Sequence, residues 1–161
     1  MEIAFLIGVF LFLAYTIAMS AMYGVPSSLS NTYYLLGEKP RGYLFTFCLW
    51  ATAFLIAPLW LSVSENLTAL VFLACGGLIL VGSAPSFMSV DKGWHTAFAL
   101  ICAVASISWQ IASGSYVPII GSLLMCLGIA ILTKSLLYAR IFWLEMTAFL
   151  STFVSIGIKS V

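Results

Sequence analysis

The sequence predicts an all-α protein: a polytopic transmembrane helix bundle with six spans, forming a single domain over residues 1–161. Of the 161 residues, 63% are hydrophobic and 7% are charged, whereas soluble domains carry about 25% charged residues. A soluble fold of this length could not bury so much apolar surface. The apolar residues also fall into runs of about 20, the length at which a helix crosses a bilayer.

Six apolar segments have this approximate length, and Tyr or Trp residues lie near most of their ends, as expected for rings at headgroup depth. We predict spans at Ile3–Tyr23, Tyr43–Val63, Leu67–Ala84, Trp94–Ser113, Tyr116–Thr133 and Tyr138–Ile158. The third and fifth spans are the shortest, so five spans with one re-entrant segment is the alternative. Only Gly114-Ser115 separates the fourth span from the fifth, which indicates a tight helical hairpin.

Small residues and prolines indicate how these spans pack. Pro118 suits the first turn of the fifth span, and Pro58 is expected to kink the second span near its end. Small residues in the third and fifth spans favour close helix contacts and permit a homo-oligomer. They are Gly76, Gly77 and Gly82 in the third span, and Ser122, Cys126 and Ala130 in the fifth.

Basic residues are distributed unequally between the two sides of a six-span bundle. The odd-numbered loops contain Lys39, Arg41, Lys92, Lys134 and Arg140, and the other side contains Lys159. Because cytoplasmic loops are enriched in Lys and Arg, both termini are expected on the non-cytoplasmic side. We expect a multi-pass integral protein of a bacterial inner membrane. A net charge of +1 provides no basic face, so nucleic acid is not an expected partner.

The fourth span carries a polar stripe that begins at the single histidine of the chain. At about 100° per residue, one narrow helix face contains His95, Ala99, Cys102, Ser106, Gln110 and Ser113. Exposure to lipid would leave the imidazole and the Gln110 amide without partners, so this stripe should face protein or water. It either holds neighbouring helices together or continues a polar pocket into the membrane.

Glu145 is the strongest single indication of a functional site. It lies about two turns, or roughly 9 Å, into the sixth span, where an ionisable group normally faces the bundle interior or a cavity. Arg140 is about 140° away around the helix, so the two side chains should not pair. We predict that the nearest polar neighbours of Glu145 are His95, Ser106 or residues of the first loop, and that its carboxyl group is protonated or shares a hydrogen bond.

The other candidate residues come from the first loop and from the start of the fourth span. The loop over residues 24–42 is rich in Ser, Thr, Asn and Tyr, and it is either a capped linker with a short helix starting near Ser30 or a lid. Asp91 and His95 are one helical turn apart and could hydrogen-bond. We expect one cytoplasm-facing polar pocket. Its candidate residues are Ser28, Ser30, Tyr33, Tyr34, Asp91, His95, Cys102, Ser106, Gln110 and Glu145.

The sequence contains no recognised catalytic or cofactor-binding motif. Its four cysteines are separated within apolar stretches, and no histidine lies at ligand spacing, so no catalytic residue, cofactor or metal site is predicted. Three functions remain, in order of preference. The first is transport or binding of a small solute, ion or lipid; the second is a structural or accessory subunit; the third is an intramembrane lipid-modifying enzyme with His95 as base. The lipid bilayer is the expected partner in each.

Overall fold

The computed structural model describes residues 1–37, 40–83 and 92–161, and all regular structure within these ranges is helical. The long helices are α1 (Glu2–Tyr23), α3 (Tyr43–Ser62), α4 (Thr68–Ser83), α5 (Lys92–Ala112), α6 (Tyr116–Leu132) and α7 (Arg140–Lys159). A short helix, α2 (Asn31–Leu35), lies in the first loop, and a 3₁₀ turn, η1 (Glu65–Leu67), precedes α4. The all-helical class and the short helix after Ser30 are therefore confirmed.

Within the described residues, five helical segments are long and apolar enough to cross a membrane. They are Glu2–Tyr23, Tyr43–Ser62, Glu65–Ser83, Gly93–Ala112 and Arg140–Lys159. The helix at the predicted fifth span, α6, is apolar but has only 17 residues. The long helices begin and end within two residues of the predicted limits, except that Ala84 lies outside the described residues. The fold is compatible with a helical membrane bundle.

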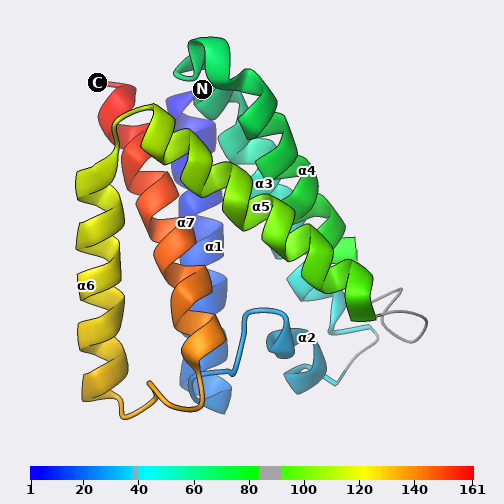
Figure 1. The fold of residues 1–161 in the computed structure, drawn as a ribbon. Helices are drawn as coiled ribbons and strands as arrows, with labels where there is room; N and C mark the ends of the chain where they lie inside the picture. Colours follow the sequence, from blue (N-terminus) through cyan, green and yellow to red (C-terminus); the bar gives the residue numbers. More distant parts are fainter. Residues whose placement is uncertain (38–39, 84–91) are drawn as a thin grey trace.

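The long helices run in alternating directions, and the two chain ends lie at the same end of the bundle (Figure 1). Helix α1 packs against α3, α4 packs between α3 and α5, and α6 packs mainly against α7. Helix α5 crosses the bundle obliquely, so that it lies near α7 at its C-terminal end and diverges from α7 towards its start (Figure 1). This divergence determines where the pocket described below can form.

A tight turn connects the end of α5 to α6. Gly114 has a φ of +74°, a conformation that side chains with a Cβ rarely adopt. The N–H of Ser115 donates to the carbonyl of Gln110 at 2.8 Å, and the N–H of Gly114 donates to that of Ile111 at 3.0 Å. These bonds satisfy carbonyls at the helix end and reverse the chain, as the Gly-Ser dipeptide predicted.

Glycines bring α4 close to both of its neighbours. A Cβ on Gly77 would lie 2.9 Å from the backbone nitrogen of Cys102 in α5, and one on Gly82 would lie 3.0 Å from Cδ1 of Trp50 in α3. The hydroxyl of Thr46 also donates to the carbonyl of Gly82 at 2.7 Å. Close packing is thus confirmed at these two glycines, whereas a Cβ on Gly76 would meet nothing within 4 Å.

The small-residue ridge of α6 is buried. Ser122, Cys126 and Ala130 expose 5%, 2% and 0% of their surfaces, and they lie on the helix that packs against α7. Large apolar side chains elsewhere on α6 are exposed, among them Val117 and Leu124. Helix α6 therefore presents a small-residue face to the protein and a bulky face outwards, which suits lipid contact.

Gly77→Ala is expected to destabilise the contact between α4 and α5. The new methyl group would overlap the backbone of Cys102, so the two helices would have to separate. Overpacking of this kind costs about 1–3 kcal/mol, which should lower the thermal unfolding midpoint of the purified protein in detergent. Gly76→Ala is the matched control, because the space around it is open. Equal midpoints for the two variants would contradict this close contact.

Candidate functional site

The first loop folds back onto α7. The backbone N–H of Leu29 donates to Oε2 of Glu145 at 2.7 Å, and the N–H of Phe142 donates to the carbonyl of Ser27 at 3.2 Å. On the α1 side, the hydroxyls of Tyr15 and Thr32 lie 2.6 Å apart. A main-chain group of the first loop is thus a hydrogen-bond partner of Glu145, as predicted for this loop.

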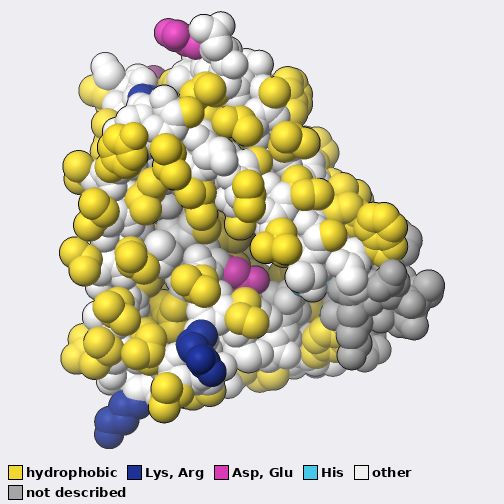
Figure 2. Space-filling model, in the orientation of Figure 1, with side chains coloured by type: hydrophobic (Ala, Val, Ile, Leu, Met, Phe, Trp, Pro, Cys, Tyr) yellow, Lys and Arg dark blue, Asp and Glu magenta, His cyan; other side chains and the backbone are white. Residues whose placement is uncertain are grey.

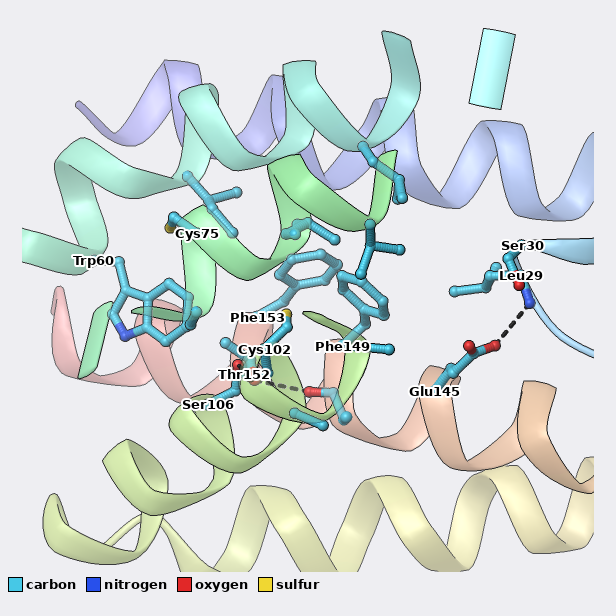
Figure 3. Close-up of a pocket in the computed structure, with 18 of the residues that line it drawn as sticks. Leu29, Ser30, Trp60, Cys75, Cys102, Ser106, Glu145, Phe149, Thr152 and Phe153 are labelled. Atoms are coloured by element: carbon cyan, nitrogen blue, oxygen red, sulfur yellow. Dashed lines mark hydrogen bonds between the residues drawn. The ribbon is translucent and has the colours of Figure 1, made fainter. Parts of the chain in front are cut away.

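A pocket between α3, α4, α5 and α7 extends from Glu145 and the first loop at one end to Trp60 at the other (Figure 3). The empty space between its walls, including the part open to the outside, is about 720 Å³. Of this, about 80 Å³ is wide enough to be reached by the centre of a water-sized molecule. Most of the lining side chains are apolar. Those contributed by α3 and α4 are Phe45, Leu49, Ile56, Trp60, Ala74, Cys75, Leu78 and Val81.

The polar side chains of the pocket largely hydrogen-bond within their own helices. The hydroxyl of Ser106 donates to the carbonyl of Cys102, and that of Thr152 donates to the carbonyl of Ala148, both at 2.7 Å. The Glu145 carboxyl group differs, because its bond to Leu29 uses only Oε2. The second oxygen lies on the side of the pocket (Figure 3). Glu145 is therefore the polar group best placed to bind a molecule inside the pocket.

Four of the ten candidate residues lie together along this pocket: Ser30, Cys102, Ser106 and Glu145. Ser28 is not a lining residue, but its hydroxyl oxygen lies 3.1 Å from that of Ser30. Asp91 lies outside the described residues, so its predicted bond to His95 does too. The remaining four candidates are outside the pocket lining. Aliphatic and aromatic side chains from α3 and α4 line much of this space, which we had expected to be a polar pocket.

Tyr33 and Tyr34 belong to the packing of the first loop. Tyr33 is 4% exposed and meets Tyr34 edge to face with ring centroids 5.3 Å apart, while Tyr34 is 41% exposed. His95 lies in the first turns of α5, which diverge from α7 (Figure 1). Its Nδ1 is buried and has no hydrogen-bond partner in the described part of the chain. The divergence of α5 explains why His95 is not among the lining residues that accompany Glu145.

Gln110 joins α5 to α7 instead of lining the pocket. Its side chain is fully buried, its Nε2 donates to Oγ1 of Thr152 at 3.0 Å, and its Oε1 accepts a bond from the Ser155 hydroxyl at 3.3 Å. Ser106 is 6% exposed, so at both positions the polar stripe faces protein as predicted. At the level of Gln110, the stripe holds neighbouring helices together.

Sequence reasoning missed Thr152, Ser155 and the aromatic lining residues. Thr152 and Ser155 are three residues apart on α7, so they share a helix face, and this spacing could have identified them as partners for a buried amide. Trp60, Phe149 and Phe153 carry no comparable signal, since any apolar residue in a span can face lipid or a neighbouring helix.

Comparison of the chain with models of protein families, with curated proteins and with solved structures finds no match. The class supported by the fold is a helical membrane protein, since five helical segments have the length and apolar composition of membrane spans.

Gln110→Leu is expected to weaken the contact between α5 and α7 while nearly preserving side-chain volume. Interhelical hydrogen bonds in membranes contribute about 0.6 kcal/mol on average, and Thr152 and Ser155 keep bonds to carbonyls of α7. We therefore expect a loss of about 1 kcal/mol, seen as a lower thermal midpoint in detergent.

Ser108→Ala is the control for this substitution, because Ser108 is partly exposed on α5 and should leave the midpoint unchanged. Thr152→Val should then cost less in the Gln110→Leu protein than in the wild type, because the shared bond is already lost. Strictly additive effects would contradict a direct bond between the two side chains.

Proposed function

We propose that this protein crosses the membrane six times and binds a lipid, or another small apolar molecule, in the pocket between α3, α4, α5 and α7. The observation that carries the proposal is the pocket itself: a long, mainly apolar space with a carboxyl group at one end. Pockets for small molecules are typically apolar with a few placed polar groups. This pocket has that composition.

The opening of the pocket favours a ligand from the bilayer. On the face shown in Figure 2, an acidic side chain is visible at the bottom of a hollow with apolar side chains around it. In the same orientation, α5 and α7 diverge at this position (Figure 1). A molecule in the surrounding lipid could move sideways into such a hollow without passing through water. We therefore favour binding over a transport path.

Six spans are supported by the alternating directions of the helices and by the two chain ends at one end of the bundle (Figure 1). At 1.5 Å per residue, the 17 residues of α6 extend about 25 Å, close to the roughly 30 Å of a hydrocarbon core. The positive-inside rule then places α2 and the Glu145 end of the pocket in the cytoplasmic half of the membrane. A bacterial inner membrane is the bilayer we propose.

An accessory subunit without a ligand is the second candidate. The arrangement around Gln110 favours it, because part of the polar stripe is used for contacts between helices. The position of Glu145 favours ligand binding over the accessory subunit, since placing a carboxylate beside an apolar pocket costs free energy and a purely structural role does not require one.

Single cysteines introduced at Glu2, Lys134 and Lys159 test the topology. All three residues are exposed, and the wild-type chain gives the background from its four native cysteines. With six spans, an impermeant thiol reagent should label positions 2 and 159 from one side of the membrane and position 134 from the other. Labelling of positions 134 and 159 from the same side would contradict a membrane-spanning α7.

A hydrocarbon chain that carries a photoreactive group tests whether the pocket binds lipid. We expect hexadecanol with a diazirine in its chain to label pocket residues such as Cys102 and Phe149 saturably, with excess plain hexadecanol abolishing the adducts. Adducts on the exposed face of α6 should not saturate, because they report bulk detergent or lipid. Mass spectrometry of peptides from the purified protein measures both.

Ala148→Phe should reduce the saturable adducts at least five-fold, because Ala148 lines the pocket and the larger ring would fill it. Ala112→Phe is the matched control, since this alanine is exposed on α5. Both variants must elute as single monodisperse species. If no pocket residue is labelled saturably, lipid binding is contradicted and the accessory subunit becomes the preferred function.

A further inference from the structure

The shape of the pocket is the first constraint on its ligand. On α3, the lining residues run from Phe45 to Trp60, which corresponds to about 22 Å along the helix axis. The space open to the centre of a water-sized molecule is only about 80 Å³ over this extent. A long, narrow, apolar space suits one extended hydrocarbon chain better than a bulky ring system or a two-chain lipid.

The charge at the open end is the second constraint. Glu145 is the acidic residue among the lining side chains, and no lysine or arginine lines the pocket within the described residues. Arg140, on the same helix, is exposed, and its Nε donates to the carbonyl of Leu137 at 3.2 Å. In the part of the chain that the structure describes, the carboxyl group therefore receives a backbone N–H but no cation.

The direction of the free oxygen is the third constraint. Because Leu29 occupies Oε2, the other oxygen of Glu145 is the one turned towards the pocket (Figure 3). Ser30 lines the same end, and its hydroxyl oxygen, which lies 3.1 Å from that of Ser28, can also accept a hydrogen bond. Two acceptors beside an apolar channel complement a head group that donates hydrogen bonds, and a cationic donor gains most from a carboxylate.

We propose that the pocket takes a single-chain amphiphile whose head group is a protonated amine, with the ammonium bound to Glu145 and Ser30 and the chain extending towards Trp60. This inference rests on the proposed binding function and adds the ligand class. It excludes fatty acids as the preferred ligand, because their carboxylate would face the carboxylate of Glu145.

Competition against the photoreactive hexadecanol tests the head group on the wild-type chain. Hexadecylamine, hexadecanol and hexadecanoic acid share one chain length and differ in the head group. We expect the amine to displace the label at a concentration at least ten-fold lower than the alcohol, and the acid to be the weakest. Equal competition by all three, or strongest competition by the acid, would overturn the amine while leaving lipid binding intact. Absence of saturable labelling would instead overturn both.

Butylamine separates an amphiphile from a free soluble amine. It carries the same ammonium without the long chain, so it should fail to displace the label at concentrations where hexadecylamine succeeds. Displacement by butylamine as effective as that by hexadecylamine would overturn the single-chain ligand.

Glu145→Gln tests the assigned partner. We expect the ten-fold advantage of the amine over hexadecanol to disappear in this variant, because a neutral amide cannot pair with the ammonium, and Glu145→Asp to recover part of that advantage. Glu2→Gln, at an exposed glutamate in the first turn of α1, is the matched control. An amine advantage that persists in Glu145→Gln would overturn the assignment. Should Glu145→Gln fail to fold, the head-group order on the wild-type chain decides the question.

Discussion

The hydrogen bonds of Gln110 set the geometry on which the pocket depends. A buried amide in an apolar environment must find partners, and Gln110 finds them in Thr152 and Ser155, which brings α5 and α7 together near their C-terminal ends. Helix α5 is also held against α4, by the close approach of Gly77 to Cys102. With these contacts satisfied, the start of α5 diverges from α7, and the space between them becomes the pocket.

Helix positions were predictable because a bilayer demands a fixed length of apolar sequence. The predicted limits at Tyr43, Tyr116 and Tyr23 coincide with helix ends in the structure. The inward orientation of Ser106 and Gln110 was also predictable, since polar groups avoid lipid. The oblique course of α5 was not, because crossing angles result from the shapes of many contacting side chains. His95 was for that reason assigned to a pocket whose lining does not include it.

The chemistry of the site was predictable only in part, for a related reason. Glu145 stands out in any reading of the sequence, because a carboxylate inside an apolar span is rare and costly. The partner of Glu145 does not stand out in the sequence, because the donor is the main-chain N–H of Leu29. Every residue except proline carries that group. The apolar lining was equally hard to recognise, because Trp60 and Phe153 resemble the lipid-facing residues of the same helices.

That the donor to Glu145 is a main-chain group also bears on how this site would tolerate sequence drift. A side-chain donor can be lost through one nucleotide change, whereas the amide at position 29 survives replacement of the side chain by any residue that keeps the loop in place. Selection on position 29 would then act through its buried, 5% exposed side chain, as selection for size and apolarity. Among distant descendants of this chain, the carboxylate could stay fixed while its partner position varied among several aliphatic residues and proline stayed excluded.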